Sequence, residues 1–149
     1  MLGSETKTSH IIKGINNSLL RNINYKFLLY GNESKIKKKL DFYKTLRKSV
    51  EVIDCEHFIE MNDKPSNIIK SKKRSSMSLA IDSVKNNESD AVLSFGNTGA
   101  LMSFSLINIK TLESIKRPAI ASIWPNKKGE SVVLDLGANT KLDSRYLID

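Results

Sequence analysis

The chain has 149 residues, the length of a single domain. Hydrophobic residues make up 40% of it and charged residues 27%, a balance that excludes an intrinsically disordered or collagen-like chain. No apolar run approaches the ~18 residues of a membrane span, and the first residues lack the pattern of a signal peptide. Cys55 is the only cysteine, which excludes an internal disulfide framework and a cysteine-rich zinc site and suits a reducing cytosol.

The formal net charge of +8 is the feature that first suggests a nucleic-acid partner. Lysines outnumber arginines, however, and are spread from Lys7 to Lys141 with few aromatic residues among them. Nucleic-acid surfaces usually combine clustered basic residues with aromatic side chains that stack on bases. We therefore expect a solvated basic surface and no nucleic-acid partner. An acidic partner, such as an acidic protein, an anionic lipid or a nucleic acid, is the alternative.

The first part of the chain predicts alternating helices and short strands. Isoleucine and leucine recur every three or four positions in residues 11–19, a spacing typical of an amphipathic helix. The apolar run 26–30 is stopped by Gly31 and predicts a buried strand. A basic helix is expected around residues 36–46, and residues 50–53 predict a second strand.

Two helix starts are expected in the middle of the chain. Pro65 predicts the opening of a short helical segment that carries Ile68 and Ile69. After a basic loop, Ser75 or Ser76 predicts the N-cap of a longer helix, because the apolar residues that follow lie at i, i+3, i+4 and i+7.

Three further strands are expected, at residues 91–95, 119–123 and 131–136, with an apolar helix through residues 101–109 after the first of them. The polar stretch 126–130 predicts a hairpin-like loop. Strands separated by helices imply βαβ crossovers, so the expected fold class is α/β, with a largely parallel sheet flanked by helices. No closing element follows the last strand, so the sheet is expected to be incomplete.

The Ser94–Gly99 segment is the first candidate site, because ligands bind beyond the carboxyl ends of parallel strands. Gly96 and Gly99 let the backbone approach an anion, and the start of the following helix directs N–H groups toward the same point. Asn97 and Thr98 add side-chain donors, which makes the turn a candidate phosphate or oxyanion cradle. The alternative is an ordinary strand–turn–helix with a threonine cap; the segment has neither the Walker A nor the dinucleotide-binding pattern.

The second candidate lies at the end of the last expected strand, where Asp135 interrupts an apolar run. A carboxylate in that position costs several kcal/mol unless it is paired or hydrogen-bonded. In the functional interpretation Asp135 orients a lysine or a loop beside the site, and Asn139 presents its amide to the substrate. In the alternative, Asp135 accepts hydrogen bonds from local backbone donors.

The third candidate is a basic segment immediately before a helix start. Basic side chains in that position can bind phosphate or the acidic face of a protein, although most such segments are solvated loops. The residues concerned are Lys70, Lys72, Lys73, Arg74, Ser75 and Ser76.

Five segments together resemble the phosphate acyltransferases of bacterial phospholipid synthesis, the PlsX family. The order and spacing of the segments match throughout, and the resemblance covers nearly the whole chain. The segments are Asp63-Lys64-Pro65, Lys72-Lys73-Arg74-Ser75-Ser76-Met77, the run from Ser94 to Met102, Arg117-Pro118-Ala119, and the run from Leu134 to Asn139.

The resemblance implies a reaction, in which a fatty acyl group passes reversibly from acyl-(acyl carrier protein) to inorganic phosphate. The acyl phosphate formed serves phospholipid biosynthesis through a membrane-bound glycerol-3-phosphate acyltransferase. No cofactor and no metal are implied, because bound phosphate can itself attack the thioester. The resemblance further implies a three-layer fold like that of isocitrate and isopropylmalate dehydrogenases, a homodimer, and a cytoplasmic location with peripheral membrane association.

The resemblance also implies a role for each candidate residue. Asn97, Thr98, Asp135 and Asn139 are the expected catalytic residues, since donors are needed where charge develops on the thioester carbonyl oxygen. Lys70 and Lys72 are expected to bind the carrier protein. The residues expected to bind phosphate are Lys73, Arg74, Ser75, Ser76, Ser94, Gly96 and Gly99.

The sequence departs from the family at its beginning and in its length. Family chains are longer and begin with a strand that ends in Asp-Ala-Met-Gly-Gly-Asp, where this chain starts Met1-Leu2-Gly3-Ser4. Residues 1–149 are therefore expected to be an N-terminal part of the family domain. The main alternative is a catalytically inactive remnant that retains only phosphate or carrier-protein binding. A nucleic-acid-binding domain and, by fold analogy alone, a nicotinamide-dependent dehydrogenase are the others.

Overall fold

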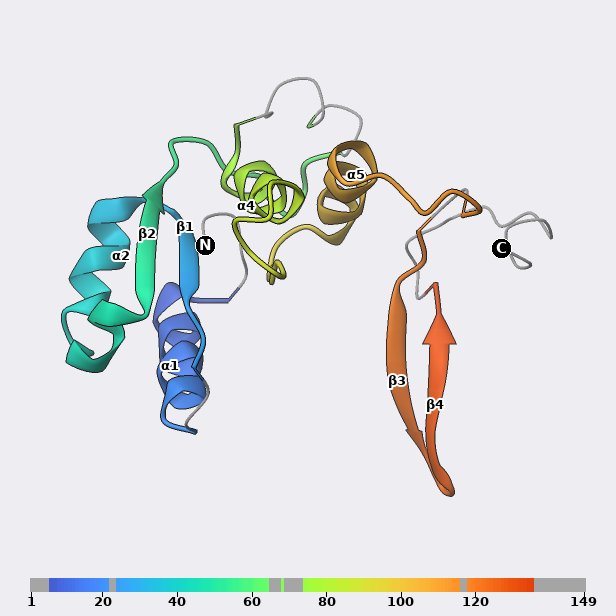
Figure 1. Ribbon diagram of the computed structural model, residues 1–149, viewed down its shortest axis with the longest axis horizontal. Helices are drawn as coiled ribbons and strands as arrows, with labels where there is room; N and C mark the ends of the chain where they lie inside the picture. Colours follow the sequence, from blue (N-terminus) through green and yellow to red (C-terminus); the bar gives the residue numbers. More distant parts are fainter. Residues whose placement is uncertain (1–5, 22–23, 65–67, 69–73, 116–117, 136–149) are drawn as a thin grey trace.

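The computed structural model describes residues 6–21, 24–64, 68, 74–115 and 118–135, and the structural statements below concern these residues. They form an α/β structure (Figure 1). In chain order the elements are α1 (Thr8–Leu19), β1 (Phe27–Gly31), α2 (Glu33–Leu40), the 3-10 helix η1 (Lys44–Lys48), β2 (Val50–Asp54), α4 (Ser76–Lys85), α5 (Thr98–Asn108), β3 (Ala121–Asn126) and β4 (Gly129–Leu134).

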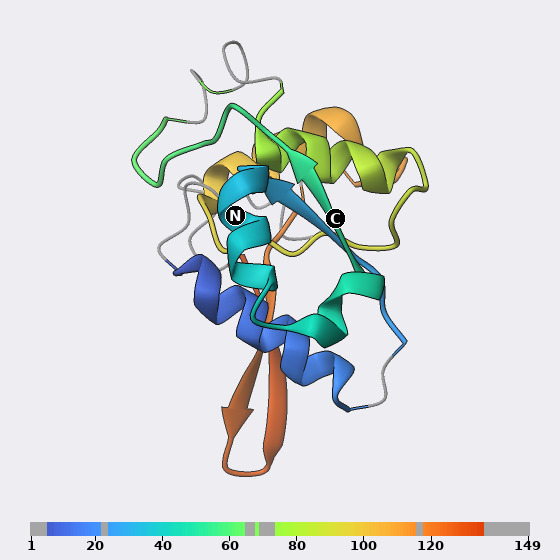
Figure 2. The same cartoon turned by 90° about the vertical axis from the view of Figure 1, so that its left-hand side faces the viewer.

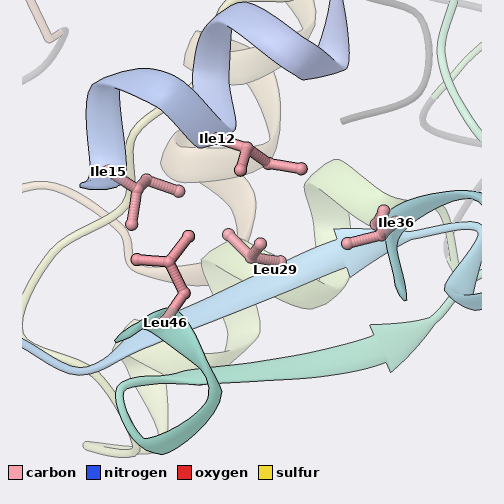
Figure 3. Close-up of a cluster of buried hydrophobic side chains, with 5 residues drawn as sticks. All are labelled: Ile12, Ile15, Leu29, Ile36 and Leu46. Atoms are coloured by element: carbon pink, nitrogen blue, oxygen red, sulfur yellow. The ribbon is translucent and has the colours of Figure 1, made fainter. Parts of the chain in front are cut away.

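Strands β1 and β2 form a parallel pair, which α2 and η1 connect. In the register of this strand pair Leu29 lies beside Val52, so both side chains point to the same face of the pair. That face is covered by α1 and α2, whose isoleucines share a buried cluster with Leu29 (Figure 3). The buried members of this cluster are Ile12, Ile15, Leu29, Ile36 and Leu46.

The start of α2 is held by two side-chain oxygens. Asn32 is its N-cap, and its Oδ1 accepts a hydrogen bond from the backbone N–H of Lys35 at 2.9 Å. Oδ1 of Asp54, at the end of β2, accepts from the backbone N–H of Glu33 at 2.8 Å. Because helix starts carry amides without intrahelical acceptors, these two contacts fix α2 to the strand ends.

A second buried cluster joins α4 and α5. Its buried members are Ile59, Ile68, Ile81, Ala100 and Phe104. Nδ2 of Asn108 also donates to Oδ1 of Asp82 at 2.7 Å, which ties the later turns of the two helices together. Helix α4 contacts β1, and Figures 1 and 2 place α2 and α4 on opposite sides of the parallel pair. The strands therefore lie between two layers of helix.

Strands β3 and β4 form an antiparallel hairpin that extends away from the helices in Figure 1. Ile123 lies opposite Val132, and their side chains are 65% and 72% exposed. The hairpin is therefore held by its backbone ladder rather than by a buried side-chain core. No helix within the described residues combines the length and apolarity needed to cross a bilayer.

The structure confirms part of the predicted strand order and corrects the rest. Strands at 26–30 and 50–53 and the polar hairpin loop are confirmed. The strand predicted at 91–95 is wrong: the segment is irregular, and Leu93 within it is 81% exposed. An apolar sequence forms a strand only where a neighbouring strand accepts and donates its backbone hydrogen bonds, and the described part of the chain places none there.

The expected α/β class with parallel strands and flanking helices is confirmed, but the last two strands are not parallel. The described strands form two separate pairs, and only β1–β2 is parallel. The last two strands are joined by the two residues Lys127 and Lys128, and so short a loop joins only antiparallel strands. The predicted helical segment near Pro65 lies mostly outside the described residues, although Ile68 is helical and buried.

Candidate functional site

The start of α5 is capped by Asn97. Its backbone is not helical, and its Oδ1 accepts a hydrogen bond from the N–H of Ala100 at 2.9 Å. The cap is therefore asparagine, whereas the ordinary-turn alternative had assigned it to threonine. Thr98 and Gly99 form the exposed first turn. Helix geometry leaves the amides of these two residues without an intrahelical acceptor, which gives the site its capacity to bind an anion.

The other end of the Asn97 side chain holds a distant loop. Its Nδ2 lies 3.2 Å from the carbonyl oxygen of Glu60, 2.9 Å from that of Met61 and 3.0 Å from that of Asp63. Asn97 is 7% exposed. One buried amide group therefore caps α5 and fastens the Glu60–Asp63 loop to it.

The Glu60–Asp63 loop is also closed on itself. The backbone N–H of Glu60 donates to Oδ2 of Asp63 at 2.9 Å, and the N–H of Asp63 donates to the carbonyl of Glu60 at 3.2 Å. Ile59, just before the loop, is 2% exposed and packs in the cluster that contains Ala100 and Phe104. Hydrophobic packing and hydrogen bonds therefore set the loop against the first turns of α5.

The start of α4 is hydrogen-bonded to the segment just before the Glu60–Asp63 loop. Ser75 is its N-cap, with Oγ accepting from the N–H of Ser78 at 3.3 Å, which confirms the predicted cap. The N–H of Ser76 donates to the carbonyl of His57 at 3.0 Å. The segment from His57 to Asp63 therefore runs past the starts of both helices, and two of the predicted site segments are brought together by it.

The predicted phosphate-binding residues that the structure describes differ in their exposure and in their hydrogen bonds. Arg74 is exposed beside the start of α4, whereas Ser75 and Ser76 are buried. Oγ of Ser94 accepts a hydrogen bond from the N–H of Gly96 at 3.2 Å, which closes the turn before Asn97. The serines thus shape the helix starts, and the exposed groups are the arginine and the first turn of α5.

Asp135 lies just beyond β4, not within a strand. The predicted strand 131–136 instead ends at Leu134, and Asp135 adopts a φ of 56°, a left-handed conformation that aspartate tolerates better than most residues. Its N–H donates to the carbonyl of Ile120 at 2.7 Å, at the base of the β3–β4 hairpin. Asp135 therefore follows the strand in a left-handed conformation and does not interrupt it. Four other predicted site residues lie outside the described residues: Lys70, Lys72, Lys73 and Asn139.

Cys55 lies at the end of β2, where its N–H donates to the carbonyl of Gly31 at 3.1 Å. Burial raises the pKa of its thiol, which keeps the side chain protonated. A protonated, buried thiol is a poor nucleophile. Within the part of the chain that the structure describes, no three histidine, cysteine or acidic side chains gather as a metal site would require.

The sequence did not predict the role of the Glu60–Asp63 loop. Its contribution comes from backbone carbonyls, which every residue type carries, so composition gives no sign of it. The available signal was positional: Asp63 and Lys64 belong to one of the five segments on which the family resemblance rests.

Comparison with known proteins covers the entire chain. Residues 1–149 match the family model described as "Fatty acid synthesis protein". A phosphate acyltransferase of Sinorhizobium fredii is 40% identical over 150 residues, covering 100% of this chain and 43% of that protein. One of Rhodopseudomonas palustris is 43% identical, covering 98% and 42%.

A third relative, the phosphate acyltransferase of Pelagibacter ubique, is 41% identical over 148 residues, covering 99% of this chain and 44% of that protein. The chain thus spans about two fifths of the length of the curated relatives it matches. Both the family match and the level of identity lead to one conclusion. The chain belongs to the fatty acid synthesis protein family, and the relatives it resembles are phosphate acyltransferases.

Proposed function

We propose that this chain takes part in the reversible transfer of a fatty acyl group from acyl-(acyl carrier protein) to inorganic phosphate, which yields an acyl phosphate for phospholipid biosynthesis. The relatives' name, phosphate acyltransferase, supports the reaction class. The observation that carries the proposal is the first turn of α5. There Gly96 and Gly99 flank a capped helix start whose leading amides have no intrahelical acceptor.

The proposed chemistry requires phosphate to be held and aimed rather than covalently activated. A phosphate oxygen attacks the thioester carbonyl carbon, the new C–O bond forms, and the C–S bond breaks. The sulfur of the carrier protein leaves with the electron pair and takes up a proton. Amides of the α5 start and the hydroxyl of Thr98 would bind the phosphate, and donors near the carbonyl oxygen would stabilise its developing charge.

The remaining roles follow the sequence interpretation. In the proposal Asn139 donates to the carbonyl oxygen, and Asp135 orients a basic side chain. Lys73 and Arg74 add positive charge for phosphate, with the α4 cap residues Ser75 and Ser76 behind them. Turn residues Ser94, Gly96 and Gly99 shape the cradle on the α5 side, as the 3.2 Å contact between the N–H of Gly96 and Oγ of Ser94 supports.

The proposed partners follow from charge and from the reaction. An acidic carrier protein suits a chain of net charge +8, with Lys70 and Lys72 as the expected contacts. The product would pass to a membrane-bound glycerol-3-phosphate acyltransferase. We further propose a homodimer, and a cytoplasmic location with peripheral membrane association. The layering of helices about β1 and β2 supports a three-layer family domain like that of isocitrate and isopropylmalate dehydrogenases.

The test is phosphate-dependent release of free carrier protein from palmitoyl-carrier protein by the purified 149-residue chain. Release that requires both the chain and phosphate, with acyl phosphate as the second product, is the expected result. Release that proceeds equally in sulfate would contradict the proposal. Saturable carrier or phosphate binding without turnover would support the alternative instead, a chain that retains binding but not catalysis.

A further inference from the structure

We infer that Asn97 is a positioning residue, which fastens the Glu60–Asp63 loop to the first turn of α5 and so makes the loop one wall of the phosphate site. The inference rests on the proposed function for the identity of the ligand. The link itself stands on four hydrogen-bond distances between groups far apart in the sequence.

Both ends of the Asn97 side-chain amide are engaged in hydrogen bonds. Its Nδ2 carries two hydrogens, and three carbonyl oxygens lie within 3.2 Å of that nitrogen, so at least one hydrogen is shared. Its Oδ1 accepts from the N–H of Ala100. At 7% exposure the side chain is also largely withdrawn from water. Asn97 therefore organises the site from behind, and its amide is not directed at a substrate.

The contacts of Nδ2 with the three loop carbonyls, which form a clamp on the loop, also restrain the backbone next to a basic residue. The carbonyl that Asp63 contributes belongs to the peptide bond joining it to Lys64, so the clamp restrains that peptide directly. Lys64 is exposed. Lys64 is therefore the exposed basic residue that directly follows a carbonyl held by Asn97.

The asparagine side chain both accepts the capping hydrogen bond and donates to the loop carbonyls. Aspartate is an equally good N-cap, so Asn97→Asp keeps an acceptor for the N–H of Ala100. It removes the donor, however, and sets a buried carboxylate against three carbonyl oxygens. Asn32 provides the matched control, since it caps α2 by the same geometry, with Oδ1 2.9 Å from the N–H of Lys35. Asn32→Asp should therefore leave the loop unchanged.

The experiment measures amide hydrogen exchange of the 149-residue chain, with and without inorganic phosphate. Without phosphate, Asn97→Asp should speed exchange at the Glu60 and Asp63 amides at least about tenfold, which corresponds to about 1.4 kcal/mol. Asn32→Asp should change those rates less than about twofold. Asn97→Ser, which keeps a capping oxygen and adds no charge, should give the same loop effect if the aspartate variant fails to fold.

Phosphate then tests the role of the loop in the site. In the wild type, phosphate should slow exchange at Gly99, Glu60 and Asp63 together. In Asn97→Ser, which places no negative charge beside the bound phosphate, the slowing at Gly99 should persist and that of the loop should disappear, an uncoupling that loss of stability alone would not produce.

Each contrary outcome has a separate meaning. Loop exchange that is equal in the wild type and both Asn97 variants would overturn the clamp. Slowing by phosphate at Gly99 without slowing in the wild-type loop would show that the loop forms no wall of the phosphate site, while leaving the proposed function in place. No slowing at any of these amides would contradict the proposed phosphate site and, with it, the role of the loop as a wall of that site. The exchange rates without phosphate would still test whether Asn97 holds the loop.

Discussion

Nδ2 of Asn97 lies 2.9 Å from the carbonyl oxygen of Met61, although the two residues are 36 positions apart in the sequence. This contact joins the loop after β2 to the start of α5. The carbonyl of His57 accepts from the N–H of Ser76 in the same stretch of chain, so the start of α4 is joined to it as well. Two helix starts, each favourable to an anion, thus share one connecting segment.

Gly96→Val should weaken phosphate binding at least about tenfold, because a branched side chain in the turn obstructs the approach of an anion to the backbone. Helix α5 should remain formed, since its cap at Asn97 is unchanged. Titration with phosphate and circular dichroism measure the two effects. Gly14→Val is the control, because a Cβ atom added at Gly14 in α1 meets no neighbouring atom within 4 Å. Equal phosphate affinity in the folded Gly96 variant and the wild type would remove the turn from the site.

Lys64→Met should reduce phosphate affinity about threefold at low salt and less at high salt, because an exposed charge is screened by ions. Lys85→Met removes an exposed lysine from the last turn of α4 and should have no such effect. Isothermal titration at two ionic strengths compares the variants. Matching affinities for both variants would show that the loop lysine does not serve the site.

Simultaneous replacement of Lys72, Lys73 and Arg74 by alanine should weaken binding of the acyl carrier protein and flatten its dependence on salt. The matched control replaces Lys35, Lys38 and Lys39, three exposed lysines of α2, and leaves the net charge of the two variants equal. Binding is followed by fluorescence anisotropy of labelled carrier protein. If both triple variants lose affinity alike, net charge rather than this segment attracts the carrier.

The buried thiol of Cys55 should make folding stability depend on pH in the alkaline range. Burial raises the pKa of Cys55, so the folded state keeps its proton where the unfolded state has lost it. The free energy of unfolding should therefore be highest below the ordinary thiol pKa and fall as pH rises through the higher folded value. Urea unfolding at several pH values tests this, with Cys55→Ala as the control; an equal alkaline slope in both proteins would exclude the thiol as its cause.

The sequence predicts this fold well where the determining forces are local. The apolar run before Gly31 forms β1 as expected, and Ser75 caps α4 because its hydroxyl needs only the amide three residues on. Residues 91–95 show the opposite case, since strand propensity without a partner strand leaves Leu93 exposed.

In the candidate site, too, the local features could be predicted and the long-range contacts could not. The start of α5 could be recognised from Gly96, just before the helix, and Gly99, in its first turn. The bonds of Asn97 to Glu60 and Asp63 could not be predicted, since they join backbone groups more than thirty residues away and any residue type supplies a carbonyl.

The central claim is that phosphate binds at the start of α5, and backbone amide chemical shifts during a phosphate titration test it most directly. The 149-residue chain is titrated at low ionic strength, with sulfate and chloride in parallel. The account predicts saturable shifts that are largest at Thr98 and Gly99 and extend to the Glu60 and Asp63 amides. Shifts that fail to saturate, or that concentrate at the exposed lysines Lys127 and Lys128 of the hairpin loop, would contradict it.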